Sequence, residues 1–363
     1  MSQRIWSKLI LFIGKAGMVL PVSDTLIEIL QTIFTEEQAR FLLNFNKPSL
    51  TIDQIKKKAQ IDEDMLDKML NDLMYIGAID TVSEEKTGMI YNLQPFMPGL
   101  FESPLMRGGT SEKEKKLANM YEKYFDELTQ DVQKNYDTIV PLFKNAPPAI
   151  RVVPVEEEID VPEKIVLPYE EVTKIIDKYD TFGVGYCYCR HGKDLVGDPC
   201  KLDAPRENCL LFGEYAKFRI EHEFIKPVSK EEALKILRKA EEYGLVHNAF
   251  HTNEDPESKE IAICSCCKCC CTVLSFHHRG LAPMNTLTSY LAKVNEESCV
   301  GCGTCVEKCP MEAIDLEDTV AVVNEDSCIG CGICAHHCPE ESMTLNRTAL
   351  RNVFVPPPRL INV

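Results

Sequence analysis

The chain has 363 residues with 56 acidic and 40 basic side chains, and its formal net charge is −16. This length allows two or three domains, and the acidic balance argues against a protein that chiefly binds nucleic acid, because phosphate contacts need a basic surface. The eighteen cysteines lie between positions 187 and 338, which argues against a secreted disulfide scaffold and favours metal binding in a reducing compartment.

The first residues do not have the pattern of a membrane span. The most apolar run, 5–21, is 17 residues long and is interrupted by Lys8 and Lys15, whereas a span needs about 20 apolar residues. No convincing small-residue cleavage site follows, so the run does not have the form of a signal peptide. We expect a first helix that packs on its own domain, and a cytoplasmic protein.

Residues 1–100 are predicted to form a winged-helix-like α domain. Apolar side chains recur at helical spacing, and the part after Gly77 reads as two short strands joined by a turn near 84–88. The predicted elements are helices over 23–34, 36–45, 49–61 and 62–74 and a two-stranded wing over 78–93.

The charges of this domain oppose DNA binding. The helix predicted over 62–74 would occupy the recognition position, yet it carries five carboxylates against Lys68 alone. Lys56, Lys57 and Lys58 precede it and could touch a phosphate backbone, but such contacts do not read bases. We therefore expect a structural or protein-docking module, with nucleic acid an unlikely partner.

Residues 101–149 are predicted to be a long amphipathic helix and a linker. The helical pattern covers 112–143 and places methionine and aromatic side chains on one stripe, which is typical of a core or a subunit interface. A homodimer is therefore one expectation. Prolines between 141 and 162 then mark a boundary.

Residues 150–290 are predicted to form a cysteine-rich α+β domain. Ser229 and Glu232 form a capping box that begins a helix, and Gly244 ends it. The other predicted elements are a helix over 169–179 and strands over 151–155, 164–167, 182–187, 245–250 and 261–264.

Ten cysteines lie in this domain, and the run 264–271 has no packing explanation. Six fall within the eight residues 264–271 and would oxidise or crosslink unless a metal held most of them. We expect shared sites built from both halves of the domain, with neighbours such as Cys266 and Cys267 pointing in different directions on an extended chain. Arg190 and His191 adjoin this set and are interpreted as solvated loop residues rather than donors to a cluster. The ten are Cys187, Cys189, Cys200, Cys209, Cys264, Cys266, Cys267, Cys269, Cys270 and Cys271.

The grouping of these ten cysteines stays open at this point. They could supply eight ligands for two cubanes with two thiols to spare, one cluster of unusual type, or a redox-active site with a free thiolate. No nucleotide-binding fingerprint accompanies them to favour an enzyme.

Residues 291–348 contain two near-identical cysteine runs. Each reads C-x2-C-x2-C-x3-C-P, the first beginning at Cys299 and the second at Cys328, and the flanking residues repeat at the same 29-residue offset. The spacing is typical of 4Fe–4S binding. Zinc also uses C-x2-C pairs, but rarely three consecutive steps followed by Cys-Pro. The stretch 294–346 resembles a dicluster bacterial-type ferredoxin.

This resemblance implies two 4Fe–4S clusters, with the fourth cysteine of each run completing the other run's cluster. The implied ligand sets are Cys299, Cys302, Cys305 and Cys338 for the first cluster and Cys328, Cys331, Cys334 and Cys309 for the second. Residues 349–363 then form a tail in which Val355–Arg359 is polyproline-like and is expected to lie along the surface.

Taken whole, the chain resembles a group of iron–sulfur proteins from anaerobes. The resemblance rests on Cys187-Tyr-Cys-Arg, Asp198-Pro-Cys, Cys209-Leu-Leu-Phe-Gly and Ile263-Cys-Ser-Cys-Cys, together with the winged-helix-like start and the ferredoxin end. It implies an electron-transfer component of anaerobic redox metabolism.

We therefore expect a multi-domain α+β protein that passes single electrons between redox partner proteins or within a larger oxidoreductase complex. Two ferredoxin clusters and one or two further iron–sulfur clusters would carry the electrons. A reductase with a catalytic cluster or thiolate in the cysteine-rich domain is the alternative. A redox-sensing DNA-binding regulator is the third possibility.

Overall fold

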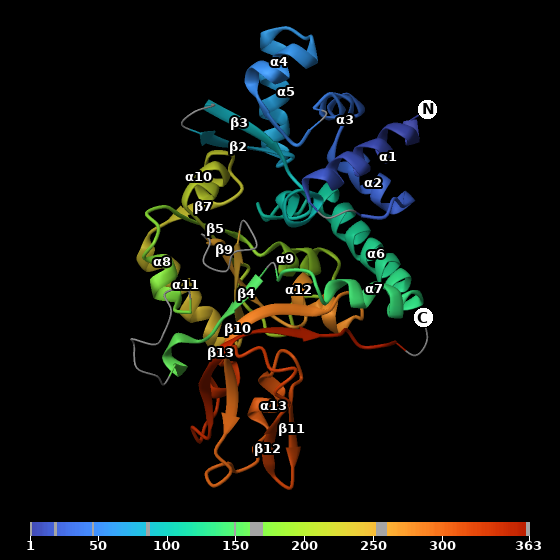
Figure 1. Ribbon diagram of the computed structural model, residues 1–363. Helices are drawn as coiled ribbons and strands as arrows, with labels where there is room; N and C mark the ends of the chain where they lie inside the picture. The colour runs from blue at the N-terminus through green and yellow to red at the C-terminus, as the bar shows by residue number, and fades with distance from the viewer. Residues whose placement is uncertain are drawn as a thin grey trace.

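The computed structural model describes residues 2–17, 20–45, 47–84, 88–148, 150–159, 170–251 and 260–360. The architecture is α+β, with an eight-stranded sheet at the centre of the molecule. In Figure 1 the N-terminal helices lie above this sheet and a small lobe carrying α13, β11 and β12 projects below it.

The N-terminal region is a group of capped helices followed by a hairpin. Its helices begin where a side-chain oxygen accepts a backbone N–H, as at Ser23, Thr35, Thr51 and Asp62. The strands form a small antiparallel sheet in the order β1-β3-β2. The elements are α1 Ser2–Ile13, α2 Asp24–Ile33, α3 Glu36–Leu43, β1 Ser49–Thr51, α4 Ile52–Ala59, α5 Glu63–Ile76, β2 Ile79–Glu84 and β3 Gly88–Leu93.

The single long helix expected over 112–143 is two helices in the structure. α6 covers Glu112–Lys134 and α7 covers Tyr136–Phe143, and Asn135 between them has a non-helical backbone. The apolar stripe of α6 is buried in the chain's own core, where Tyr121 and Phe125 pack edge-to-face on Phe101. The homodimer that this stripe suggested stays a prediction.

The central sheet has the strand order β13-β10-β4-β8-β9-β6-β5-β7. Among the described residues the β10–β4 pair is parallel, and the other neighbouring pairs in the sheet are antiparallel. The strands are β4 Ile150–Val153, β5 Phe182–Tyr186, β6 Glu207–Phe212, β7 Lys226–Val228, β8 Val246–His251, β9 Glu260–Cys266, β10 Met284–Val294 and β13 Met343–Val355. The helices around them are α8 Val172–Ile176, α9 Tyr188–Leu195, α10 Gly213–Glu221, α11 Lys230–Glu242 and α12 Thr272–His278.

The two faces of this sheet are chemically different. Leu210 and Ile263 belong to the buried cluster that α8 and α11 cover. Their strand neighbours Cys209 and Cys264 belong to the opposite cluster, beneath α10, because successive side chains on a strand alternate between faces. The alternation therefore places the strand cysteines together on one face.

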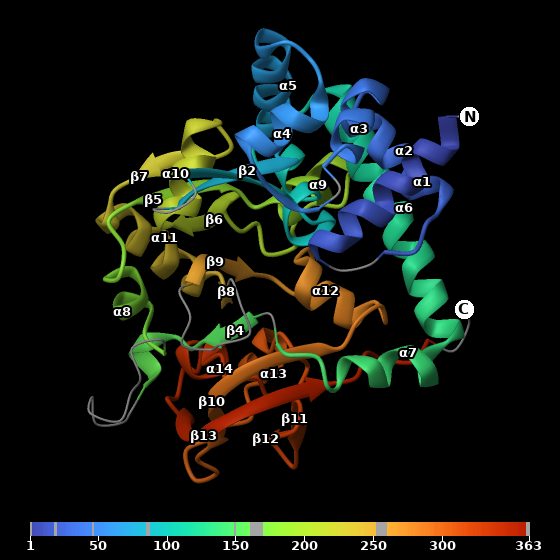
Figure 2. The same ribbon diagram turned by 45° about the horizontal axis from the view of Figure 1, so that its top comes forward.

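The lobe is continuous with the central sheet through β10 and β13. These strands pair with each other from Met284–Val355 at one end to Val294–Met343 at the other, with an irregularity between Thr288 and Tyr290. Figure 2 shows them side by side beneath β4. The lobe elements between them are α13 Thr304–Lys308, β11 Ile314–Glu317, β12 Val320–Val323 and α14 Ile333–His336.

Some boundaries predicted from the sequence do not coincide with the ends of these elements. The limits 291 and 348 expected for the ferredoxin domain lie within β10 and β13, and the domain division itself stays a prediction. The strand predicted over 164–167 lies outside the described residues. The helix predicted over 169–179 is described only as α8, and no described helix is long and apolar enough to cross a bilayer.

Candidate metal centres

The outer end of the lobe holds a cavity lined by four cysteines. Cys299, Cys302, Cys305 and Cys338 surround about 320 Å³ of empty space that is partly open to solvent. Cys302 is exposed and the others are half-buried or buried. These residues are the set implied for the first ferredoxin cluster, and thiolates around a space of this kind fit a 4Fe–4S group.

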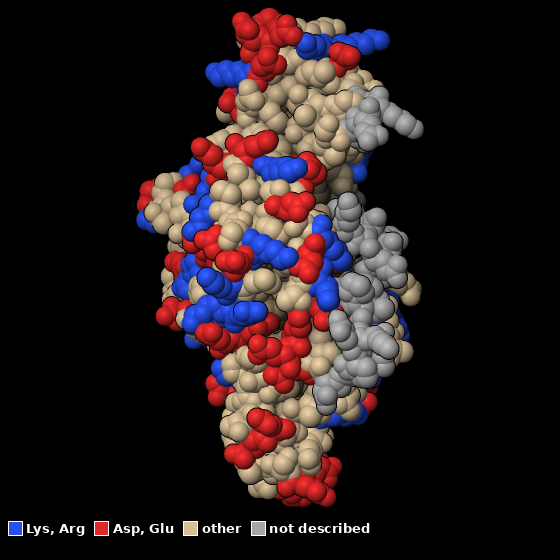
Figure 3. Space-filling view, turned by 90° about the vertical axis from the view of Figure 1, so that its left-hand side faces the viewer, with Lys and Arg blue, Asp and Glu red and all other residues tan. Residues whose placement is uncertain are grey.

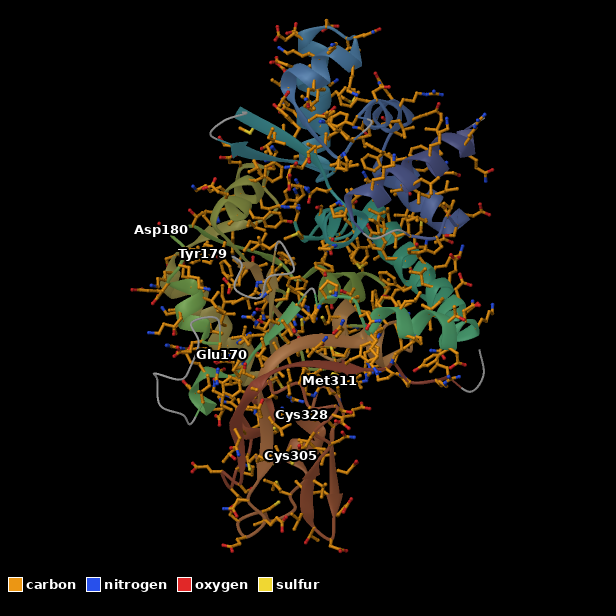
Figure 4. The ribbon with its side chains drawn as sticks, in the orientation of Figure 1. Glu170, Tyr179, Asp180, Cys305, Met311 and Cys328 are labelled. Atoms are coloured by element: carbon orange, nitrogen blue, oxygen red, sulfur yellow. The ribbon has the colours of Figure 1, made fainter. Side chains whose placement is uncertain are left out.

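The other four cysteines of the repeat lie deeper, against the body of the molecule. Cys309, Cys328, Cys331 and Cys334 are all buried. Burial raises the pKa of the Cys331 and Cys334 thiols. Figure 4 labels Cys328 nearer the junction with the central sheet than Cys305.

The inner cysteine loop, which carries Cys328 and Cys331, is held to the body by hydrogen bonds to its backbone carbonyls. The N–H of Val155 donates to the carbonyl of Cys331 at 3.1 Å, and Arg351 donates to the carbonyls of Cys328 at 2.5 Å and Tyr290 at 3.1 Å. Gly330 has a φ of +64°, and a Cβ there would collide with the Tyr290 carbonyl. Glycine is therefore required for this close approach.

Two hydroxyl groups distinguish the outer site from the inner one. Thr304 Oγ1 lies 3.4 Å from Cys302 Sγ, and Ser342 Oγ lies 3.2 Å from Cys338 Sγ. At the 29-residue offset of the repeat, the counterparts of Thr304 and Ser342 are Ile333 and Ala313. Both hydroxyl groups therefore lie within hydrogen-bond distance of sulfurs of the outer set.

The ten cysteines of the central domain separate into six and four. The six line one pocket with about 360 Å³ of empty space, partly open to solvent, together with Asn208 and Phe250. They come from the strand face beneath α10 and from the starts of two helices. The six are Cys187, Cys189, Cys209, Cys264, Cys266 and Cys271.

Backbone N–H groups point at this six-cysteine pocket. Cys187 is the N-cap of α9 and Cys271 is the N-cap of α12, and the N–H of Thr272 donates to Cys189 Sγ at 3.4 Å. Helix N-termini favour negative charge. Even so, burial raises the pKa of Cys189 to about 12, so a metal that binds this sulfur would have to displace its proton.

The remaining four cysteines form a much tighter group, the four-cysteine knot. The ligand atoms of Cys200, Cys267, Cys269 and Cys270 all lie within 4.8 Å of one another. The hydrogen bond between Cys200 and Cys267 lowers the pKa of Cys200 and raises that of Cys267. Cysteines from both halves of the domain thus meet, while Cys266 and Cys267 belong to different groups.

Two polar residues beside these groups differ from the sequence interpretation. Arg190 and His191 are buried rather than solvated. The Arg190 guanidinium donates to the carbonyl of Ser265 at 3.1 Å, and its side chain faces thiols of both groups, Cys187 and Cys267 among them. Asn208, which the sequence analysis did not single out, is 2% exposed and its amide atoms have no hydrogen-bond partner among the described residues.

Comparison with known proteins supports the assignment of the lobe. Residues 292–345 match the family model of the 4Fe–4S dicluster domain. The chain is also 57% identical over 28 residues to a probable ferredoxin of Methanosarcina thermophila, a match that covers 8% of this chain and 48% of that protein. No solved structure matches the chain. Residues 292–345 are thus a 4Fe–4S dicluster domain, which implies iron–sulfur electron transfer.

Proposed function

We propose that the protein carries single electrons between a docking partner at the outer end of the lobe and a further iron–sulfur centre in the six-cysteine pocket. The observation that carries this proposal is one continuous cluster of buried side chains. It contains Cys266 and Cys271 of the pocket and the buried cysteines of the inner lobe site. Packed protein between two redox centres provides a short route for electrons.

We assign the ligands of the lobe by the ferredoxin pattern, with Cys338 completing the outer set and Cys309 the inner set. The outer assignment is supported by the cavity that Cys338 shares with Cys299, Cys302 and Cys305. When bound, a 4Fe–4S cluster takes up and releases one electron without rearranging bonds.

Contacts at the junction support an internal route through the inner set. His278, at the end of α12, lies with its Nε2 2.7 Å from the carbonyl of Pro310, the residue after Cys309. Cys271 caps the other end of the same short helix. α12 therefore spans the distance from a cysteine of the pocket to the inner loop of the lobe.

Iron and acid-labile sulfide analysis of the anaerobically purified full chain tests this proposal. The dicluster domain alone supplies eight irons and eight sulfides, and one cubane in the pocket raises both to about twelve. The double variant Cys264→Ser, Cys266→Ser should return both counts to eight. Fewer than eight irons in the unaltered chain, or eight in both proteins, would contradict the proposal.

A reductase is the second candidate, and the number of cysteines favours it. A single cubane uses four thiolates, so the six-cysteine pocket has two more than one cubane needs. A free thiolate beside a cluster could reduce a disulfide or an acyl-thioester. Addition of either compound should then change the electron paramagnetic resonance spectrum of the pocket centre, whereas a pure carrier gives no change.

We propose that the N-terminal region is a winged helix that docks on protein. The order of a strand, two helices and a hairpin, with strands arranged β1-β3-β2, supports the assignment. α5 begins with Glu63 and Asp64 and carries Asp67 and Asp72 against Lys68. Since these carboxylates would face phosphates, the full chain should show no specific binding to duplex DNA at physiological salt.

A further inference from the structure

The sulfur atoms of the four-cysteine knot lie closer together than those of the ferredoxin sites of the same molecule. Cys200 Sγ lies 3.8 Å from Cys267 Sγ and 3.7 Å from Cys269 Sγ, and Cys269 Sγ lies 3.6 Å from Cys270 Sγ. Within the described part of the chain, it is the one group of three or more potential metal ligands whose ligand atoms close to within 4.8 Å. Neither ferredoxin set is that compact.

These distances fit one metal ion at the centre of four sulfurs. A tetrahedron with metal–sulfur bonds of about 2.3 Å has sulfur–sulfur edges of about 3.8 Å. In a cubane each thiolate binds a different iron, which holds the sulfurs farther apart. The lobe cysteines serve as an internal comparison, because four of them line an open cavity instead of closing on one another.

The local backbone brings these four thiols close together. Cys267, Cys269 and Cys270 lie in one turn between β9 and α12, closed by a hydrogen bond from the N–H of Cys271 to the carbonyl of Cys267 at 3.2 Å. Cys200 comes from the loop after α9, and the N–H of Ala204 donates to its sulfur. Backbone donors to ligand sulfurs are typical of thiolate metal sites.

The buried guanidinium of Arg190 lies beside the knot and would be stabilised by a negatively charged group. Arg190 is fully buried, its Nε has no hydrogen-bond partner among the described residues, and its Nη1 and Nη2 donate to the neutral carbonyl of Ser265. Its guanidinium faces the sulfurs of Cys187, Cys267 and Cys200. A divalent ion with four thiolates has a net charge of −2, which makes it a suitable partner for a buried guanidinium.

We propose that Cys200, Cys267, Cys269 and Cys270 bind a single zinc ion in tetrahedral geometry, separate from every iron–sulfur cluster of the protein. Zinc accepts four thiolates in closed structural sites and undergoes no redox change. The ion ties the loop at Cys200 to the turn after β9. It thereby fixes Cys266 and Cys271, which flank that turn and line the six-cysteine pocket.

Metal analysis of the full chain, produced with both iron and zinc in the medium and purified anaerobically, tests the proposal directly. We expect one zinc per chain in addition to the iron of the clusters. Zinc-edge X-ray absorption of the same sample should show four sulfur neighbours at about 2.3 Å and no iron in the second shell. A zinc content near zero, or oxygen and nitrogen ligands, would overturn the assignment.

A crossed pair of variants separates this site from the pocket. Cys269→Ser, Cys270→Ser should lose the zinc and keep the eight irons of the lobe, while Cys264→Ser, Cys266→Ser should keep the zinc whatever happens to the pocket iron. If the unaltered chain contains no zinc and the first variant loses four irons and four sulfides, the knot holds a cubane and a single ion is refuted. One iron without sulfide in place of zinc would also refute the proposal. The spectroscopic measurement on the unaltered chain stays decisive if the first variant fails to fold.

Discussion

At the scale of single residues, the two halves of the ferredoxin repeat are not equivalent. Thr304 and Ser342 bring hydroxyl groups to Cys302 and Cys338 of the outer set, and the aligned residues of the inner set have none. Hydrogen bonds to ligand sulfur stabilise the more negative, reduced state of a cluster and raise its potential. We therefore expect the outer site to have the higher reduction potential.

The variant Thr304→Val, Ser342→Ala tests this asymmetry. Each lost hydrogen bond is worth about 0.5–1.5 kcal/mol, and about 59 mV corresponds to a tenfold change for one electron, so one of the two lobe potentials should fall by about 40 to 130 mV. Redox titration followed by electron paramagnetic resonance measures it. The matched change Ile333→Thr should raise the other potential, and equal shifts of both potentials in either variant would contradict the asymmetry.

A second residue-scale prediction concerns Arg190. Its buried guanidinium faces thiols of the six-cysteine pocket and favours an added electron there. Arg190→Gln should lower the potential of the pocket centre by roughly 60 mV, the equivalent of about 1.4 kcal/mol for one electron, and leave the lobe potentials unchanged. Arg238, exposed on α11, provides the control Arg238→Gln. A pocket potential that stays constant would show that the cation acts only on packing.

At the scale of elements, the junction between lobe and sheet depends on Arg351. From β13 it donates to Tyr290 on β10 and to Cys328 in the inner loop, at the point where the ladder is irregular. Arg351→Ala removes charge-assisted hydrogen bonds worth about 1.5–3 kcal/mol each. Amide hydrogen exchange at 288–291 and 328–331 should then become at least tenfold faster.

The neighbouring Lys293 supplies the control for this experiment. It pairs with Glu325 on an exposed surface, where an ion pair contributes only up to about 1 kcal/mol. Lys293→Ala should leave exchange at the junction nearly unchanged. If both variants loosen the junction equally, the ladder rather than Arg351 holds the lobe.

Local elements were predictable from sequence because their signals are local. The capping box at Ser229 begins α11 as predicted, and the cysteine spacing identified the dicluster domain, whereas the helix predicted over 49–61 begins only at Ile52, after the strand β1. The division of ten cysteines into six and four was not predictable. It depends on strand pairing such as Cys209 with Cys264, and on the turn that directs Cys267 away from Cys266.

At the scale of the whole molecule, negative charge is concentrated where the proposed partner docks. Residues 295–342 contain eleven carboxylates and a single basic residue, Lys308, which accounts for most of the net charge. Figure 3 shows acidic side chains and no basic ones at the tip of the lobe on the face it displays. The C-terminal tail lies beside α6 and α7, away from the tip of the lobe (Figure 1), where Tyr136 and Gln133 donate hydrogen bonds to the carbonyls of Pro357 and Pro358.

This charge pattern predicts that electron transfer out of the lobe depends on electrostatic attraction. An acidic surface steers a basic partner and raises the association rate, and salt screens the effect. Cytochrome c can serve as a basic one-electron acceptor. Its rate of reduction by the full chain should fall steeply between about 20 and about 300 mM salt, because the Debye length shortens over this range and exposed charges become screened.

Substitutions beside the outer site locate the docking surface. Glu340 and Glu341 are exposed next to Cys338, and Glu340 lines the outer cavity. Glu340→Gln, Glu341→Gln should lower the low-salt rate about three- to tenfold and flatten its salt dependence, because two of the steering charges are gone. Glu37→Gln, Glu231→Gln removes the same charge from exposed positions outside the lobe and should change little. If this control slows the reaction as much as the lobe variant, electrons leave through another face of the molecule.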